Sequence, residues 1–299
     1  MRHFWLGILV STMILAACGD DDSDFATRPD GRDSSSSSVI LSGDSHEGSS
    51  SSSSSSSSVK SSSSAKSSSS AKYSSSSVTL ATQCKTDSTD TCEYGELLDD
   101  RDGQTYKTVK IGDQWWMAEN LNYAYLQPTD ELDSSSFCYN DSAEYCEKYG
   151  RLYLWSAAMD SAGTWSSNGK GCGYGAACSP TAPVRGVCPE GWHLPTQTEW
   201  NTLFTAVGDS SIAGKMLKSI SGWNSSGNGT DAYSFSALPA GYINYDRCYL
   251  YEDYYAGFWS STELNSDYAY YTYLYYYNGY ASLVDYFKYD GFSVRCVKD

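Results

Sequence analysis

The stretch Cys188–Trp200, CPEGWHLPTQTEW, decides the fold of the second half of this 299-residue chain. Thr196 and Glu199 stand three residues apart, as in the Thr-x-x-Glu capping box that opens a helix. Apolar side chains then recur at the i, i+3, i+4 and i+7 spacing of an amphipathic helix, at Trp200, Leu203, Phe204 and Val207. We therefore expect a helix that begins behind Thr196 and buries one face.

Three further helices are expected on either side of this stretch. One follows it closely, around Ser211–Ile220, with an inward face formed by Ile212, Met216, Leu217 and Ile220. Two shorter helices are expected earlier in the chain, at Ala143–Lys148 and Ser156–Ser161.

Strand-like sequence surrounds these helices. Within residues 105–120, Gly112–Asp113 separates two β-rich runs and indicates a hairpin turn. Asn278–Gly279, one of the strongest hairpin signals, separates two more runs. Further strands are expected at Phe235–Tyr242, Phe258–Ser261 and Phe292–Val297. Helices followed by a strand-rich portion indicate the α+β class.

The N-terminal residues 1–17 read as a secretory signal. A charged start precedes an apolar run, residues 4–15, that is too short to remain in a bilayer as a spanning helix. The run ends in LAAC, residues 15–18, which resembles the bacterial lipobox. The resemblance implies cleavage before Cys18 and acylation of that residue, and acyl chains bind membranes at about 0.8 kcal/mol per buried CH2. We expect a lipid anchor in the outer membrane.

Residues 18–83 read as a tether. Gly19–Asp24, GDDDSD, resembles the acidic export tags that send some lipoproteins to the outer face of the cell; a solvated charge run is the alternative. Ser34–Ser77 is almost pure serine and cannot bury a core, so we expect it to be disordered. A coil of this length has an end-to-end distance of roughly 45 Å. The folded part is thus expected to stand clear of the membrane at the cell surface.

The part expected to fold, residues 84–299, is acidic. It holds 28 Asp and Glu against 14 Lys and Arg. Nucleic-acid binding depends on basic residues that release counterions from phosphates, so no nucleic-acid partner is expected. Neutral polymers, such as most plant cell-wall glucans, are not disfavoured by this charge.

Nine cysteines follow Cys18, which indicates an oxidising compartment. They include no Cys-x-x-Cys pair, so a zinc knuckle is not expected. The most economical of several pairings is Cys84–Cys92, Cys138–Cys146, Cys172–Cys178 and Cys188–Cys296. Cys248 is then left as the expected free thiol.

Five stretches resemble the Fibrobacter succinogenes major paralogous domain, and they occur in its order. They are DGQTYKTVKIGDQWWMAEN at 102–120, YGRLYLWSAAM at 149–159, CPEGWHLPTQTEW at 188–200, FWSSTE at 258–263 and GFSVRCV at 291–297. That family has no established biochemical activity, and its members are secreted or lipid-anchored proteins. Residues 194–196 (LPT), 199–200 (EW) and 291–292 (GF) also resemble the C-type-lectin-like fold of formylglycine-generating enzymes. The resemblance implies one disulfide-stapled, C-type-lectin-like α+β domain with a mixed β-sheet over residues 84–299.

Tyrosine is concentrated in the C-terminal third, where it makes up ten of the 22 residues from Tyr268 to Tyr289. Tyr offers a rigid, amphipathic contact surface, and sugar rings stack on such rings. Odd and even positions of a strand point to opposite faces. One parity of the run, the odd-numbered positions, holds Tyr271, Tyr273, Tyr275 and Tyr277, and the other, the even-numbered positions, holds Tyr268, Tyr270 and Tyr276. A strand needs only one apolar face to pack, so we expect one parity to be core and the other to bind ligand. The alternative is that Tyr is simply a good strand former with both faces buried.

The candidate ligand-binding residues are Tyr245, Tyr249, Tyr251, Tyr268, Tyr270, Tyr271, Tyr273, Tyr275 and Tyr277. No catalytic residue, metal or cofactor is assigned, because no nucleophile elbow, HExxH or P-loop sequence occurs. His193 is expected to make a structural hydrogen bond. A glycosidase needs only two carboxylates, and those inside motifs are Glu119, Glu199 and Glu263, of which Glu199 is better explained as a helix cap.

We therefore predict a surface-anchored lipoprotein that is not an enzyme. Its lectin-like domain is expected to bind extracellular polymer, in the first place plant cell-wall polysaccharide, and its other partner is the membrane, reached through the anchor. A protein-interaction or structural surface component is the alternative, and a carbohydrate-active enzyme ranks third.

Overall fold

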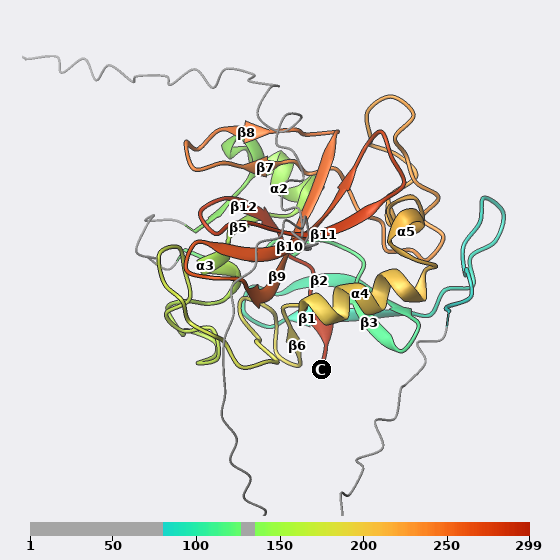
Figure 1. Cartoon of the computed structure of the whole chain (residues 1–299). Coiled ribbons are helices and arrows are strands. Elements are labelled where there is room, and N and C mark those ends of the chain that lie inside the picture. Colours follow the sequence, from blue (N-terminus) through green and yellow to red (C-terminus); the bar gives the residue numbers. More distant parts are fainter. Residues whose placement is uncertain (1–79, 127–134) are drawn as a thin grey trace, which may run out of the picture. The chain divides into compact units, whose positions relative to one another are not determined.

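The computed structural model describes residues 80–126 and 135–299 (Figure 1). These residues form an α+β domain with two β-sheets, four α-helices and disulfide bonds, which confirms the expected fold class. The C-type-lectin-like assignment stays a prediction. Cys18, the signal and most of the tether lie outside the described residues. Among the described residues, the helices are too short or too polar for any of them to traverse a bilayer.

The first sheet has five strands in the order β1-β2-β3-β13-β6. The two-residue turn Gly112–Asp113 joins β2 to β3, as the sequence predicts. Gly112 has a φ of +60°, a left-handed conformation that glycine adopts without steric cost. The strands are β1 (Tyr94–Asp99), β2 (Gln104–Ile111), β3 (Gln114–Met117), β13 (Val297–Lys298) and β6 (Trp192–His193).

The second sheet follows the path β11-β10-β9-β12-β5-β4, with the short β7–β8 hairpin attached to β12. All neighbours are antiparallel except β12 and β9, so the sheet is mixed. The hairpin around Asn278–Gly279 joins β10 to β11. The strands are β4 (Ser136–Phe137), β5 (Leu152–Leu154), β7 (Tyr242–Ile243), β8 (Tyr249–Leu250), β9 (Tyr255–Glu263), β10 (Tyr268–Tyr275), β11 (Ala281–Phe287) and β12 (Gly291–Ser293).

One segment contributes to both sheets. The single strand expected at Phe292–Val297 is in fact two, β12 in the second sheet and β13 in the first. Between them Val294, Arg295 and Cys296 are completely buried, and Cys296 is bonded to Cys188. The break arises because the segment crosses from one sheet to the other.

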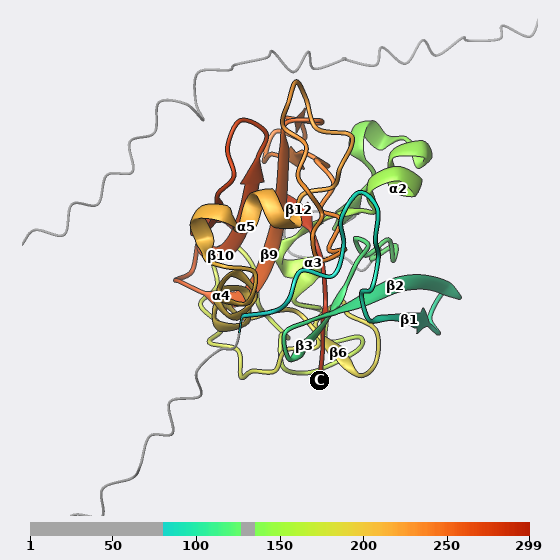
Figure 2. The ribbon, with the colours of Figure 1, turned by 90° about the vertical axis from the view of Figure 1, so that its right-hand side faces the viewer.

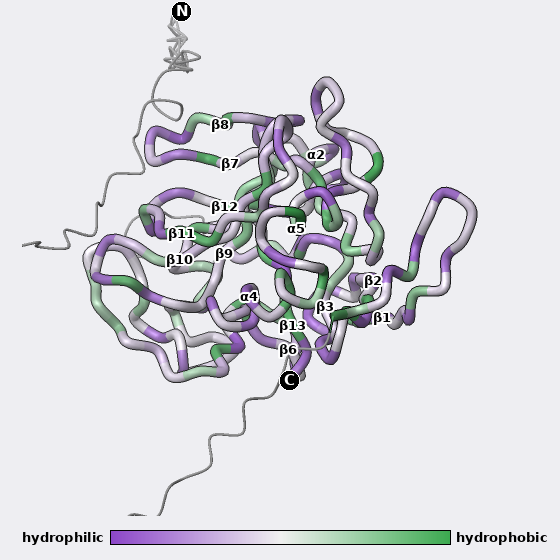
Figure 3. The backbone as a smooth tube through the Cα atoms, turned by 45° about the vertical axis from the view of Figure 1, so that its right-hand side comes forward, coloured by the Kyte–Doolittle hydropathy of each residue, from purple (hydrophilic) through white to green (hydrophobic). Residues whose placement is uncertain are grey.

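Two helices cover one face of the second sheet (Figures 1 and 2). They are α4 (Gln197–Ala206), which opens with the predicted Thr196–Glu199 capping box, and α5 (Ser210–Leu217). Their apolar faces meet the sheet in a core cluster that includes Trp200, Leu203, Phe258 and Leu274. Hydrophilic residues gather in the outer loops (Figure 3). The remaining helices are α2 (Ala143–Tyr149) and α3 (Trp155–Ala158), with a 3-10 turn at Tyr139–Asp141.

The structure corrects several expected elements. Ile212 and Ile220 are exposed rather than inward. Ile220 lies beyond the end of α5 at Leu217, and Ile212 lies in the first turn of the helix, whose buried residues are Ala213, Gly214 and Leu217. Only Tyr242 of the expected strand Phe235–Tyr242 lies in a strand, since Ser234 and Ser236 have positive φ angles that interrupt an extended backbone. The helix expected at Ser156–Ser161 ends at Ala158, before Asp160 turns left-handed.

Candidate functional site

The second sheet has two unlike faces. On the face under α4 and α5, strands β9 and β10 place Phe258 and Leu274 in the helix-packed core. The opposite face carries aromatic rings, among them Trp259 and Tyr271, which pair across the two strands. The tyrosine density of the sequence therefore belongs to the face that the two helices do not cover.

The centre of this aromatic face is core. Tyr255 and Tyr271 are buried, 1% and 2% exposed, and their phenol oxygens lie 2.9 Å apart. Tyr271 also stacks on Phe292 with 4.6 Å between ring centroids. Burial raises the pKa of both phenols well above the ordinary value. Tyr271, one of the candidate ligand-binding residues, is therefore a packing residue.

Neither parity of the tyrosine run is uniform, so the expected division into a core parity and a ligand parity is wrong. In the first set Tyr271 is buried, Tyr273 and Tyr275 are half-buried, and Tyr277 is 71% exposed. In the second set Tyr268, Tyr270 and Tyr276 are all half-buried. A shift in the β9–β10 register between Ala269 and Tyr271 and the turn after Tyr275 break the alternation.

The candidates around the β7–β8 hairpin also differ from one another. Tyr245 is 66% exposed, whereas Tyr249 and Tyr251 are half-buried. The Tyr249 phenol donates to Asp141, and Tyr251 stacks on Tyr242 at 6.0 Å. Exposed rings that the sequence did not single out are Tyr94, Tyr174, Tyr254 and Tyr280.

The surface rings form two clusters at opposite ends of the β10–β11 hairpin. At the turn, Tyr276 contacts Tyr254 at 5.1 Å and Tyr277 at 5.4 Å; we call these three residues the tip cluster. At the other end, Tyr289 contacts Phe287 at 4.7 Å and Tyr174 at 4.8 Å; we call these three the base cluster. Tyr254 of the tip cluster and all three residues of the base cluster are additions to the candidates read from the sequence.

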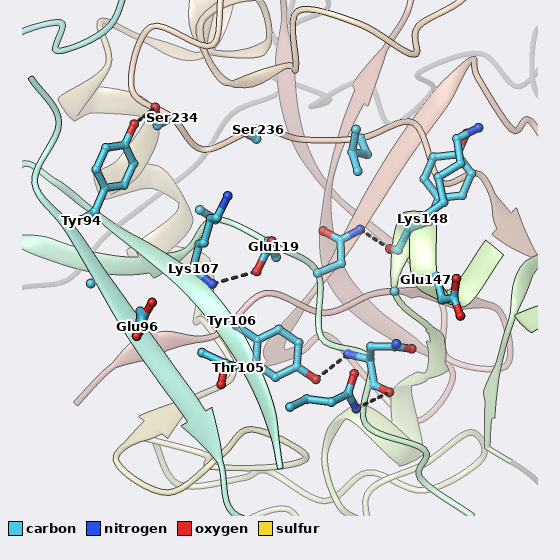
Figure 4. Close-up of a pocket in the computed structure, with 18 of the residues that line it drawn as sticks. Tyr94, Glu96, Thr105, Tyr106, Lys107, Glu119, Glu147, Lys148, Ser234 and Ser236 are labelled. Atoms are coloured by element: carbon cyan, nitrogen blue, oxygen red, sulfur yellow. Dashed lines mark hydrogen bonds between the residues drawn. The ribbon is translucent and has the colours of Figure 1, made fainter. Parts of the chain in front are cut away.

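A polar groove of about 860 Å³ lies apart from these rings, beside the first sheet. Figure 4 shows β1 and β2 on one side, with Tyr94 and Lys107, and the end of α2 with Lys148 on the other. Hydrogen bonds join its walls: the Tyr94 phenol lies 2.6 Å from Ser234 Oγ, and the Lys107 backbone N–H donates to Glu119 at 2.7 Å. Hydroxyls, amides and charges of both signs line it, which suits a polar ligand.

The histidine of the domain lies between two acids. His193 Nδ1 is 2.7 Å from Asp299 Oδ1, and Nε2 is 2.8 Å from Glu199 Oε1. Burial lowers the pKa of His193, but the two carboxylates raise it further, and the net shift is upward. His193 thus makes the structural hydrogen bonds expected of it and ties α4 to the residues after β13.

The family follows from a match along most of this domain. Residues 109–298 match the Fibrobacter succinogenes major domain. The chain belongs to the Fibrobacter succinogenes major domain family. No curated protein and no solved structure matches the chain. The match begins within β2, so β1 and one wall of the groove precede the matched residues.

The cysteines of this Fibrobacter succinogenes major domain form the four bridges that the spacing suggested. They are Cys84–Cys92, Cys138–Cys146, Cys172–Cys178 and Cys188–Cys296. The free thiol expected at Cys248 is wrong, because Cys248 is disulfide-bonded and the described residues hold no free cysteine.

The motif carboxylates of the domain all have structural partners. Glu199 caps α4 and binds His193, and Glu119 accepts from the Lys107 backbone. Glu263 accepts from the fully buried ammonium of Lys288 at 2.6 Å and from the backbone N–H of Cys178 and Ser179. Among the described residues, no cluster of three metal-binding side chains occurs. The arrangement offers aromatic surfaces and a polar groove, which are the means of binding a ligand.

Proposed function

We propose that this protein is a lipid-anchored cell-surface component whose domain binds an extracellular polymer, in the first place a neutral plant cell-wall polysaccharide. The observation that carries the proposal is the set of exposed tyrosine rings on the strand-rich half, at Tyr245, Tyr254 and Tyr277. Aromatic rings present a large rigid area at little conformational cost and stack on the C–H faces of sugars.

The charge and the groove support the same class of ligand. A net charge of −16 repels polyanions and leaves neutral polymers unaffected. The exposed side chains of Glu96, Thr105 and Lys107 line the groove, and they are groups of the kind that hydrogen-bond sugar hydroxyls.

The anchor is the second part of the proposal. The lipobox at residues 15–18 and the serine-rich tether would hold the domain outside the cell within reach of a polymer. Metabolic labelling with a palmitate analogue tests this: Cys18→Ser should abolish the label. Equal labelling of wild type and variant would show that Cys18 is not the acylated residue.

Binding is tested with the full chain carrying Cys18→Ser, so that no acyl chain contributes. A glycan array, together with retention on amorphous cellulose, xylan and xyloglucan, should give a signal that bovine serum albumin does not. A chain that binds none of these but pulls down one defined surface protein would instead support a protein-interaction component.

A further inference from the structure

The tip cluster is held in place by a buried lysine. Lys218 follows α5 and is 2% exposed. Its ammonium donates to three backbone carbonyls of the β10–β11 turn, those of Tyr275 at 3.1 Å, Tyr276 at 3.4 Å and Asn278 at 2.9 Å. It also lies 4.9 Å from the Trp223 ring. All three N–H donors are thereby satisfied by the segment that carries the exposed rings.

This lysine is buried without a counter-charge. None of the ion pairs among the described residues includes Lys218. Burial alone lowers its pKa to about 8, with no charged side chain contributing. An uncompensated buried charge opposes folding, and an apolar side chain of similar length would avoid that cost. Lys218 therefore serves a purpose other than stability, and its contacts indicate that it fixes the turn.

The backbone around the turn is confined from two further directions. Gly214 in α5 packs directly against the Tyr280 carbonyl, where any side chain would collide. A Cβ at Gly227 would come within 2.7 Å of the Tyr276 carbonyl oxygen. The Lys215 N–H donates to Gly279 at 3.0 Å. Exposed rings on a turn held so closely lose little conformational entropy when they bind.

The ring planes of the tip cluster are nearly perpendicular. The Tyr254 and Tyr276 planes make an angle of 87°, and the Tyr276 and Tyr277 planes one of 84°. Rings that lie flat on a crystalline polymer must be coplanar, which these are not. Perpendicular rings instead form a corner that accepts one sugar face and borders it with ring edges.

We propose that the tip cluster is the contact site for a single hydrated glycan chain, and that Lys218 is the positioning residue that fixes it. This rests on the proposed function that the domain binds a polysaccharide. The ligand class is a neutral, unpacked chain or chain end rather than the flat face of a crystalline polymer.

The first experiment tests whether the tip cluster, rather than the rest of the surface, binds the polysaccharide. Full chains carrying Cys18→Ser are assayed on amorphous and microcrystalline cellulose, xylan and xyloglucan, with and without Tyr277→Ala. The matched control is Tyr280→Ala, which removes an exposed ring of the same turn that makes none of the ring contacts of the tip cluster. We expect Tyr277→Ala to weaken binding about tenfold and the control less than twofold.

The outcomes distinguish this inference from the proposed function. A wild-type chain that binds none of the polysaccharides overturns both. A wild type that binds while Tyr277→Ala keeps its affinity within twofold overturns the tip site alone. Tighter retention on microcrystalline than on amorphous cellulose overturns the single-chain class.

The second experiment tests Lys218 as a positioning residue. Lys218→Met should weaken binding at least fivefold while the melting temperature stays within a few degrees of wild type. Amide exchange at residues 276–280 should accelerate, with α4 unchanged. The affinity of Lys218→Gln, which keeps a donor, should fall between those of wild type and Lys218→Met. Unaltered affinity in Lys218→Met, or accelerated exchange throughout the domain, overturns the positioning role.

Discussion

The two ends of the β10–β11 hairpin accommodate a buried lysine ammonium in different ways. At each end a buried lysine lies near a tryptophan ring and donates to three acceptors. Lys218 at the tip has only backbone carbonyls, whereas Lys288 at the base has the carbonyls of Gly173 and Ala176 and the carboxylate of Glu263. A single carboxylate thus separates a neutralised lysine from an uncompensated one. At the base the lysine–carboxylate pair stabilises the fold. At the tip the uncompensated lysine lowers stability but holds the turn.

Glu263→Gln should have the largest effect, because it leaves Lys288 charged, buried and without its carboxylate. We expect a loss of about 3–5 kcal/mol in the free energy of unfolding, measured by urea denaturation. The matched control is Glu93→Gln, which breaks the exposed Glu93–Lys110 pair and should cost less than about 1 kcal/mol. Similar losses in the two variants would remove the distinction between a buried and a surface pair.

The pH dependence of stability should lie in different pH windows at the two ends. Burial raises the pKa of Glu263, but Lys288 and the backbone N–H groups of Ser179 and Cys178 lower it further, so the net shift is downward. A lowered carboxyl pKa contributes stability above its unfolded value that is lost as the pH falls through the folded value. Wild type should therefore lose more stability in acid than Glu263→Gln.

At the tip stability should also rise with pH, but in the alkaline range. The pKa of Lys218 is lowered to about 8, so between pH 8 and the unfolded value of 10.5 the unfolded chain binds more protons. Stability should rise between pH 7 and pH 9.5, by on the order of 2 kcal/mol, relative to Lys218→Met. Parallel urea titrations at pH 7 and pH 9.5 check this, and a wild type that loses stability relative to Lys218→Met would contradict it.

The disulfide next to the base offers a third test. Cys172 and Cys178 close the loop whose carbonyls and N–H groups surround Lys288 and Glu263. Replacing both cysteines with Ser should cost about 2 kcal/mol, because the unfolded chain regains the freedom of a short loop. Combined with Glu263→Gln the losses should be less than additive, because the two features hold the same loop. Strict additivity in a double-mutant cycle would show that they act independently.

Lys218→Met should have the smallest effect on stability. Three turn carbonyls lose their donor, which opposes the gain from removing a buried charge. We expect a change within about 1 kcal/mol in the free energy of unfolding at pH 7. A loss comparable to that of Glu263→Gln would make the two ends equivalent.

Local signals predicted the local parts of this fold. Residue spacing alone carries the information for the Gly112–Asp113 turn, the Thr196–Glu199 capping box and the three short-range bridges, whereas Cys188 and Cys296 lie 108 residues apart. The burial of Lys218 and Lys288 cannot be predicted from residue spacing. Charged residues are normally exposed, and the carbonyls that accept from these two ammonium groups come from distant segments.

The candidate site shows the same limit. Tyrosine density pointed to the C-terminal third of the chain, where most of the exposed tyrosine rings lie. The register shift beside Tyr271 and the turn after Tyr275 then decided which rings are core and which are surface. Both are properties of strand pairing that alternation in one strand does not report.

The passage of residues 291–298 from one sheet into the other has a consequence for the timing of folding. β12 lies between β9 and β5, and β13 lies between β3 and β6, so neither sheet has its central pairings until these residues are available. The local pairings β1–β2–β3 and β9–β10–β11 do not need these residues, but Cys188 has no partner and both sheets stay incomplete until residues 291–298 are present. Closure of both sheets and of the Cys188–Cys296 bridge would therefore be a single late event in folding.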